Sequence, residues 1–387
     1  MKIFHVGTSI SLNQVVLDQM VDQLRRGHEV VALCPRDEWA RRIRDCGVRL
    51  LPAPFVRHDV PATLQAGIET FLACRKERPD IVHTHNSLPG IVGRMAARLA
   101  GGAAVIHTCH AWPLHLSRSR LFTLSYLALE RLAARMAGAV LFQNPDDRFA
   151  CVSQGIVPPW KAVWIGNGID LEALDAATDG VEREKVRNTL GLSSDTFVIS
   201  MVARLEPLKG HAFFLRTFQA LLERTSRRVV ALLAGFGSHG DLLRQEVARL
   251  GLDKAVRFLG YRSDIPAFLL ASDLTVLTSL YEGLPRALME AMALRRPVVA
   301  TDVPGTRSVV KDGLTGFLVP YGDVEGFVRA VGEIMGNTER ALAMGAVGRA
   351  RVEEHFNARR VHDRILAVYE HLLEKRPGPL PNWEPED

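Results

Sequence analysis

Two carboxylates stand in a stretch whose pattern predicts a strand, a loop, a helix and a second strand. The apolar run Leu274–Thr278 precedes Glu282, and Glu290 follows eight residues later, inside a helix predicted to open at Pro285. At about 3.6 residues per turn, the two carboxylates lie too far apart to form a close acid–base pair. They can instead contact two parts of one extended ligand. The alternative is a pair of surface glutamates on an amphipathic helix.

The loop before this helix suits an anion or a polyhydroxyl group. We expect the backbone N–H groups of Gly283, Leu284 and the first helical turn to point outward with the positive end of the helix dipole. Pro285 fits the first helical position because an N–H there has no intrahelical partner. The predicted site therefore lies at the carboxyl end of a strand, where open α/β sheets bind their ligands.

Two basic residues follow another apolar run, Phe197–Val202. Arg204 and Lys209 come directly after it, and a helix is predicted to start after Gly210. A guanidinium and an ammonium at a strand end can clamp a pyrophosphate and neutralise a diphosphate leaving group. An ordinary solvated basic surface is the alternative.

A glycine pattern of the dinucleotide-binding type also occurs, as Gly235-x-Gly237-x-x-Gly240. NAD binding would need an acid at the end of the following strand to hold the ribose. That strand ends at Tyr261 and Arg262, with no acid before Asp264. We therefore predict that the chain does not bind NAD.

The elements that must position these residues alternate between strand and helix in both halves of the chain. Such alternation predicts parallel, doubly wound α/β sheets. The expected strands are 2–7, 29–34, 48–52, 80–84, 104–108 and 139–143 in the first half, and 197–202, 229–234, 256–259, 274–278, 298–301 and 317–319 in the second.

Histidines mark two predicted strand ends in the first half. His83 and His85 share one face of a strand, a spacing that could suit a metal, but no third ligand is nearby in sequence. We therefore predict no metal site. His110 follows the strand 104–108 and could be a functional histidine or a packed, hydrogen-bonded one.

Composition and charge limit the classes of protein that fit. The five scattered cysteines include no Cys-x-x-Cys, which argues against a disulfide framework or a zinc site and favours a reducing, cytoplasmic compartment. Residues 1–165 carry 20 lysines and arginines against 13 acids. This basic half suits an anionic partner, although a solvated surface is the alternative. We expect no nucleic-acid partner.

The segment Leu114–Met136 combines apolar residues with four arginines. Glu130 is its single acid, and the arginines are Arg118, Arg120, Arg131 and Arg135. A helix of this composition could lie on an acidic membrane, at the inner face of the cell membrane. The alternative is an ordinary helix of the α/β fold with a basic outer face.

These motifs together resemble the retaining glycosyltransferases of family 4, which have two Rossmann-like domains facing a cleft. The resemblance rests on Glu282-Gly-Leu-Pro-x₄-Glu290, on Arg204-Leu-x₃-Lys209-Gly and on the Asn167-Gly-Ile-Asp turn. It extends from Lys2 to about Leu373. It implies domains at 1–168 and 169–357, a helix at 358–376 that packs back on the first domain, and a loose tail at 377–387.

The resemblance implies roles for the residues of the second half. Glu282, Gly283, Leu284 and Pro285 would hold the transferred sugar, and Glu290 the ribose. Arg204 and Lys209 would hold the pyrophosphate. The turn at Gly235 and Gly237 would let the donor approach closely, and Tyr261 would face the base.

In the first half, the resemblance places Gly7 near the donor phosphate and His110 near the transferred sugar. The family often has two glycines after the first strand, whereas Thr8 occupies the second position here. We predict that Glu282, His110, Arg204 and Lys209 are catalytic. The residues predicted to bind the donor are Gly7, Arg204, Lys209, Gly235, Gly237, Tyr261, Glu282, Gly283, Leu284, Pro285 and Glu290.

The resulting prediction is a retaining glycosyltransferase of bacterial polysaccharide, lipopolysaccharide or glycolipid synthesis. The donor would be a UDP- or GDP-sugar and the acceptor a saccharide or a lipid-linked saccharide. We expect no cofactor and no required metal, because two cationic side chains already neutralise the phosphates. A nucleotide-sugar epimerase and a non-catalytic nucleotide-sugar-binding protein are the alternatives.

Overall fold

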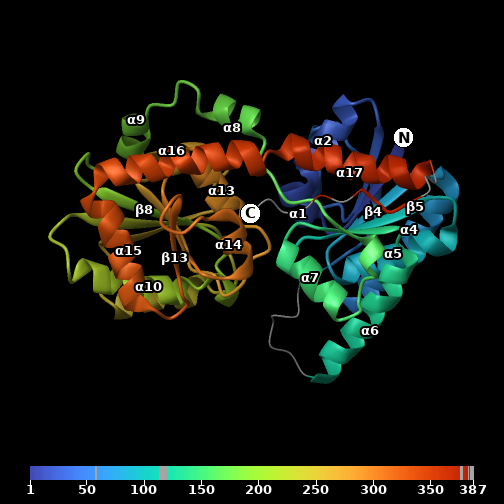
Figure 1. Ribbon diagram of the computed structural model, residues 1–387, viewed down its shortest axis with the longest axis horizontal. Coiled ribbons are helices and arrows are strands. Elements are labelled where there is room, and N and C mark those ends of the chain that lie inside the picture. Colours follow the sequence, from blue (N-terminus) through green and yellow to red (C-terminus); the bar gives the residue numbers. More distant parts are fainter. Residues whose placement is uncertain (57–58, 113–119, 375–377, 382, 384–387) are drawn as a thin grey trace. The chain divides into compact units, whose positions relative to one another are not determined.

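A computed structural model describes residues 1–387 except 57–58, 113–119, 375–377, 382 and 384–387 (Figure 1). Contacts divide the chain into two units, Met1–Asn167 with Ala358–Asp387, and Gly168–Asn357. Part of the predicted tail 377–387 lies outside the described residues. The same holds for the start of the expected basic helix, including Arg118.

The first unit contains a seven-stranded sheet in the order β3-β2-β1-β4-β5-β6-β7, with every neighbouring pair parallel. The sequence analysis predicted six of these strands and missed β7, whose three residues pair with β6. The strands are β1 (Lys2–Val6), β2 (Glu29–Cys34), β3 (Arg49–Pro52), β4 (Ile81–His85), β5 (Ala104–Cys109), β6 (Ala139–Phe142) and β7 (Ala162–Trp164).

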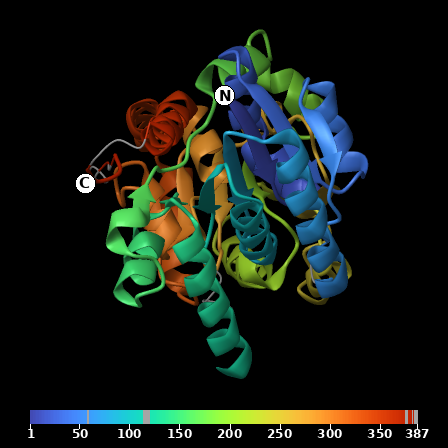
Figure 2. The same cartoon turned by 90° about the vertical axis from the view of Figure 1, so that its right-hand side faces the viewer.

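Helices cover both faces of this sheet because successive side chains of a buried strand point to opposite faces. Phe4 packs with residues of α4 and α5 on one face, whereas its neighbour Ile3 packs with α17 on the other. Figure 2 shows α6 projecting from this unit as the teal-green helix. The helices are α1 (Ser9–Ser11), a π-helical turn (Leu12–Val16), α2 (Leu17–Arg25), α3 (Glu38–Asp45), α4 (Val60–Glu77), α5 (Leu88–Ala100), α6 (Arg120–Met136), α7 (Pro145–Ser153), a 3₁₀ turn (Pro159–Lys161) and α17 (Ala358–Leu373).

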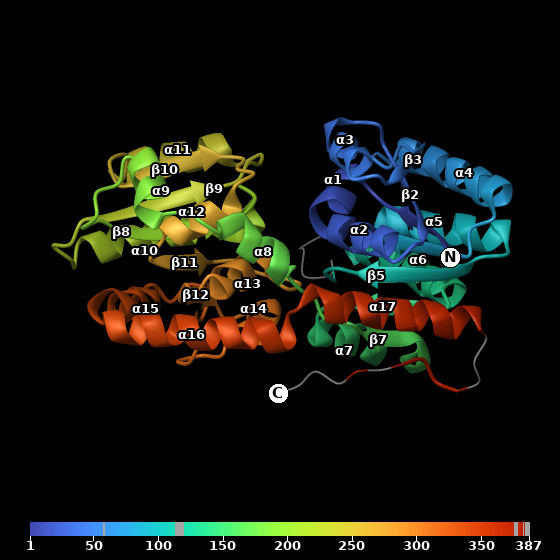
Figure 3. The same ribbon diagram turned by 90° about the horizontal axis from the view of Figure 1, so that it is seen from above.

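The C-terminal helix α17 belongs to the first unit although the second unit precedes it in sequence. It lies beside β5 (Figure 3) and buries Val368 and Tyr369 completely. Its Arg364 lies over the ring of Trp164 and donates to the carbonyl of Ile165 at 3.2 Å. The chain therefore completes the first unit with its last helix.

The second unit contains a six-stranded parallel sheet in the order β10-β9-β8-β11-β12-β13. One contiguous core of apolar side chains lies on this sheet. All six strands were predicted: β8 (Phe197–Val202), β9 (Val229–Ala234), β10 (Val256–Gly260), β11 (Leu274–Leu277), β12 (Val298–Thr301) and β13 (Gly316–Val319).

Helices of the second unit pack on one another: α10 with α11 and α15, α13 with α12 and α16, and α15 with α16. The two sheets confirm the predicted pair of doubly wound α/β domains. The helices are α8 (Leu171–Thr178), α9 (Arg183–Thr189), a 3₁₀ turn (Pro207–Lys209), α10 (His211–Leu222), α11 (Gly240–Arg249), α12 (Ile265–Ala271), α13 (Arg286–Ala293), α14 (Pro304–Val309), α15 (Val324–Gly336) and α16 (Thr338–His355).

Candidate functional site

Lys209 and Glu282 meet at the carboxyl ends of the neighbouring strands β8 and β11. The Lys209 ammonium donates to Oε1 of Glu282 at 2.6 Å, and the Ser279 hydroxyl donates to the same oxygen at 2.5 Å. Glu282 is only 8% exposed. A buried carboxylate held by an ammonium and a hydroxyl is pre-oriented, because two charge-assisted hydrogen bonds fix its rotamer.

Backbone contacts hold the Lys209 and Glu282 loops together. Leu280 N–H donates to the carbonyl of Leu208 at 2.9 Å, and the Thr278 hydroxyl donates to the carbonyl of Gly210 at 3.0 Å. Gly210 has φ +67, and a Cβ there would lie 1.8 Å from the Thr278 carbonyl oxygen. Only glycine therefore permits this approach of the two loops.

The helix after Glu282 begins one residue later than expected. Pro285 occupies the N-cap position with φ −75 and ψ 97, and α13 starts at Arg286. Within α13, Arg286 donates from Nε to Oε1 of Glu290 at 2.9 Å, so Glu290 already has a cationic partner. Glu282 and Glu290 lie on either side of this helix start, as the sequence predicted.

Arg204 lies on the surface of the same unit. Its side chain is 43% exposed and donates to Glu206 at 2.7 Å. Gly235 and Gly237 pack under this segment, since a Cβ on either would lie within 2.4 Å of the carbonyl oxygen of Ala203 or Leu205. The two glycines thus bring the β9 loop against the Arg204 loop.

Tyr261 lies at the end of β10, next to the glycine turn. Its ring stands edge-to-face with Phe236 at a centroid distance of 6.0 Å, and both rings are at least 40% exposed. Two exposed aromatic rings beside a strand end can stack on a planar ligand.

The sequence analysis missed His211, which follows Gly210. This side chain is 2% exposed, and neither ring nitrogen has a hydrogen-bond partner among the described residues. Burial, with the positive charge of Lys209 nearby, lowers its pKa to about 4. Its signal in the sequence was a polar residue at the first position of a predicted helix.

The predicted residues of the first half, Gly7 and His110, belong to the first unit. The N–H of Gly7 donates to the carbonyl of Leu33, and the N–H of Thr8 donates to the Asn86 side chain. A Cβ on Gly7 would lie 3.1 Å from Asn86 Oδ1. Any role of Gly7 toward a ligand therefore rests on its lack of a side chain rather than on its N–H.

Five histidines gather near the carboxyl ends of β1, β4 and β5. Candidate ligand atoms of His5, His83 and His85 lie within 4.8 Å of one another. A third imidazole that is distant in sequence is therefore close in space, because β1 supplies His5 beside β4. Both nitrogens of His83 are nevertheless engaged at 2.6 Å, by Tyr369 and Thr108, whereas a metal would need a free lone pair.

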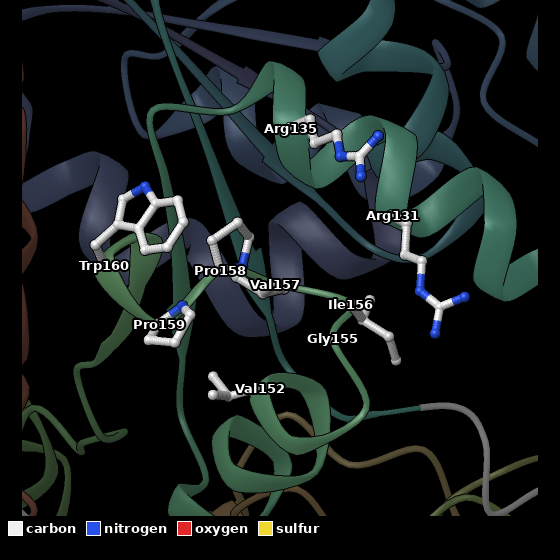
Figure 4. A pocket seen from close by; sticks show the side chains of 9 residues that line it. All are labelled: Arg131, Arg135, Val152, Gly155, Ile156, Val157, Pro158, Pro159 and Trp160. Atoms are coloured by element: carbon white, nitrogen blue, oxygen red, sulfur yellow. The ribbon is translucent and has the colours of Figure 1, made fainter.

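A pocket of about 230 Å³ lies in the first unit, and Figure 4 shows the side chains that line it. Arg131 and Arg135 reach it from α6, and Trp160, 68% exposed, lines it from the segment after α7. An indole and two guanidiniums beside apolar side chains suit an amphipathic anion. No helix in the described parts of the chain is long and apolar enough to cross a bilayer.

Comparison with known proteins bears on both units. Residues 12–168 match the glycosyl transferase 4-like domain, and residues 182–351 match glycosyl transferases group 1. The chain belongs to glycosyltransferase family 4. This glycosyltransferase is 33% identical over 305 residues to the UDP-Gal:alpha-D-GlcNAc-diphosphoundecaprenol alpha-1,3-galactosyltransferase of Escherichia coli, with 78% of each chain covered. It is 27% identical over 288 residues to the putative glycosyltransferase EpsD of Bacillus subtilis, covering 73% of this chain and 74% of EpsD.

Solved structures support the same fold for this glycosyltransferase. Anabaena HepE, in complex with UDP and glucose, superposes with a TM-score of 0.80 at 21% identity, covering 95% of this chain and 98% of HepE. WaaG, a glycosyltransferase involved in lipopolysaccharide biosynthesis, superposes with a TM-score of 0.77 at 15% identity, covering 95% of this chain and 99% of WaaG. The predicted family, fold and glycosyl transfer are therefore confirmed, and the epimerase and non-catalytic alternatives are disfavoured.

Proposed function

We propose that this glycosyltransferase moves a hexosyl group from a UDP-sugar to a lipid-linked saccharide with retention of configuration. The observation that carries the proposal is the Lys209–Glu282 contact at the ends of β8 and β11. It puts an ammonium and a carboxylate at one point of the second unit. A nucleotide sugar needs both, since its phosphates carry the negative charge and its sugar carries hydroxyl donors.

Lys209 can contact Glu282 and the diphosphate of the donor at the same time, because an ammonium has three N–H donors and the Glu282 contact uses one of them. We propose that its remaining N–H groups and the Arg204 guanidinium stabilise the charge that develops on the departing diphosphate. Glu282 would accept from hydroxyls of the transferred sugar, and Glu290 from the ribose. Two cations at the phosphates make a divalent metal unnecessary.

The choice of substrate rests on the relative from Escherichia coli. That enzyme is named for UDP-Gal and for a GlcNAc-diphosphoundecaprenol acceptor, and it shares 33% of its aligned residues with this chain. We propose UDP-galactose or another UDP-hexose as the donor and a polyprenyl-diphosphate saccharide as the acceptor.

A binding and transfer screen tests the proposal. Purified protein is heated with UDP, GDP, ADP and dTDP, with and without EDTA, and each UDP-hexose is then offered with a short-chain lipid-diphosphate GlcNAc. A ligand at 100 times its Kd adds about 2.7 kcal/mol to the free energy of unfolding. We expect stabilisation by UDP, transfer insensitive to EDTA, and an α-linked product by NMR.

Three results would contradict parts of this proposal. A β-linked product would exclude retention of configuration, and loss of transfer in EDTA would exclude a metal-independent reaction. Formation of an epimer without acceptor would support the alternative of a nucleotide-sugar epimerase. Stabilisation by GDP alone would show that the donor is a GDP-sugar rather than a UDP-sugar, and the proposed donor site would stay unchanged.

We also propose that the first unit rests on an acidic membrane through α4 and α6. Four α4 side chains, each more than half exposed, recur every four residues and so lie along one ridge: Val60, Leu64, Ile68 and Leu72. On α6, Leu124, Leu129 and Leu132 are exposed beside Arg120, Arg131 and Arg135.

The charges of the two helices favour the same surface. Of the acids described on α4 and α6, Glu69 and Glu77 are half-buried and Glu130 is buried against Arg94 at 2.6 Å. Exposed leucines and arginines, with a described exposed acid only at the α4 N-cap (Asp59), can bind anionic lipid by apolar burial and charge attraction together.

Vesicle sedimentation tests the membrane proposal. We expect binding to vesicles rich in phosphatidylglycerol, weaker binding to phosphatidylcholine, and loss of binding in Leu64→Glu/Ile68→Glu. Exposed Leu342, on α16 of the second unit, provides the control variant Leu342→Glu. Equal binding of all three proteins would exclude this surface.

A further inference from the structure

Three imidazoles and one amide form a continuous hydrogen-bonded chain inside the first unit. Gln23 Oε1 lies 2.8 Å from His5 Nε2, and His5 Nδ1 lies 3.0 Å from His85 Nε2. His85 Nδ1 then lies 3.1 Å from His110 Nε2. The chain thus runs from α2, through β1 and β4, to the predicted functional histidine after β5.

This chain has a direction, because a neutral imidazole donates from one nitrogen and accepts at the other. An amide oxygen can only accept, so the proton of His5 lies on Nε2 and its Nδ1 accepts from His85. The proton of His85 therefore lies on Nε2, and its Nδ1 accepts from Nε2–H of His110. Each step fixes the next, which leaves the Nδ1 of His110 as an acceptor.

The amide of Gln23 is oriented by a second set of contacts. Its Nε2 and that of Gln19 donate to the Tyr369 hydroxyl at 3.5 and 3.4 Å. Tyr369 is then free to donate to His83 Nδ1 at 2.6 Å, and His83 donates from Nε2 to the Thr108 hydroxyl at 2.6 Å. With the amide in this orientation every described contact pairs a donor with an acceptor.

At the His110 end of the hydrogen-bonded chain, one ring nitrogen remains outside the chain of imidazole contacts. Nδ1 of His110 is buried and no side chain within the described ranges meets hydrogen-bond geometry with it, although the Gln143 side chain interacts with this imidazole and raises its pKa against the effect of burial. Burial lowers the pKa values of His5 and His110 to about 4 and that of His85 well below its ordinary value. The imidazoles are therefore neutral at pH 7, as a directed chain requires.

We propose that Gln23 and His5 are positioning residues that hold His110 in its Nε2-protonated tautomer, so that its Nδ1 accepts a hydrogen bond from a substrate hydroxyl. The proposal rests on the predicted role of His110 in the proposed glycosyl transfer. It adds that this role is set 87 residues earlier in the sequence, by an amide on α2. A hydroxyl-rich substrate supplies the matching donor.

The tautomer is measured directly by two-bond ¹H–¹⁵N correlation spectra of the full chain with labelled histidine, assigned with His110→Asn. We expect the Nε2–H form of His110 in the natural protein. Gln23→Met removes the acceptor, so both tautomers should appear. Gln19→Met is the matched control, because Gln19 contacts the same tyrosine hydroxyl but not His5.

Transfer is measured on the same proteins. In Gln23→Met we expect kcat to fall about tenfold, a part of the 10² to 10⁴ that a well-placed proton acceptor contributes, while the Kd for UDP stays unchanged. Gln19→Met should keep both values. If Gln23→Met does not fold, Tyr369→Phe, which frees the amide to turn over, is measured instead with the same expectation.

An Nδ1–H form of His110 in the natural protein would overturn the proposal, and so would an unchanged spectrum in Gln23→Met. Zinc-dependent shifts of His5, His83 and His85 would also overturn it, in favour of a metal site. Because the spectra need no turnover, an inactive protein with the expected tautomers would contradict the proposed function and leave the directed chain standing.

Discussion

The Lys209 ammonium and the Glu282 carboxylate lie 2.6 Å apart although 73 residues separate them in the sequence. Removing one partner leaves the other charge unpaired in a largely buried place. We expect Lys209→Ala to lower kcat/KM for transfer by about 10²-fold or more and to lower the urea midpoint of unfolding. Lys209→Ala/Glu282→Gln should regain stability but not activity.

The control for this pair is Arg224→Ala. Arg224 and Glu325 form an ion pair in the same unit, but both side chains are at least half exposed. Such pairs contribute little, so activity and midpoint should stay near those of the natural protein. A Lys209→Ala variant as active as this control would remove Lys209 from the reaction.

Arg204 is more exposed than Lys209, so its replacement should lower the rate of transfer without lowering the stability of the fold. Its contact with Glu206 is exposed and stabilises the fold little. We expect Arg204→Ala to lower transfer by about 10²-fold while the urea midpoint changes by no more than in Arg224→Ala. A normal rate of transfer with UDP-hexose would show that Arg204 does not contact the diphosphate.

Replacement of Gly210 should destabilise the fold more than replacement of an ordinary turn glycine, because a backbone carbonyl lies against it. Alanine there would meet the Thr278 carbonyl at 1.8 Å and would also need φ +67. Gly251, with φ +69 and nothing within 4 Å of its added Cβ, provides the matched control. We expect Gly251→Ala to cost about 1 kcal/mol of unfolding free energy and Gly210→Ala clearly more, together with weaker binding of UDP by calorimetry. Equal losses would argue against the close approach of the two loops.

The buried histidines should make the first unit sensitive to acid. Burial lowers the pKa of His5 from 6.5 to about 4, so the folded form binds fewer protons than the unfolded chain between these values. The free energy of unfolding is therefore unaffected by His5 protonation above pH 6.5. As the pH falls to 4, protonation of this histidine in the unfolded chain lowers the free energy of unfolding by about 3 kcal/mol. Urea unfolding between pH 7 and 4 should show this fall. In His5→Phe we expect a flatter dependence, and an unchanged slope would contradict the assignment.

The sequence was sufficient for nearly all the strands of both sheets and for which residues follow them. Strand and helix depend on local periodicity, and parallel sheets collect the ends of their strands at one edge. Glu282 and Lys209 each follow an apolar run, so both were expected at strand ends, and the family resemblance implied that both would contact one donor. The short strand β7 was missed because three residues give no periodic signal of their own.

Tertiary structure alone decided which of those residues touch and which do not. Lys209 reaches Glu282 because Gly210 admits the Thr278 carbonyl, whereas Arg204 remains at the surface beside Glu206. The tertiary structure also places His5 beside His85 and brings the Tyr369 hydroxyl, from the last helix, within hydrogen-bond distance of His83. Contacts of this kind join residues up to 350 positions apart, as in Gln19 and Tyr369. They follow from strand order and helix packing, to which local sequence patterns contribute no direct information.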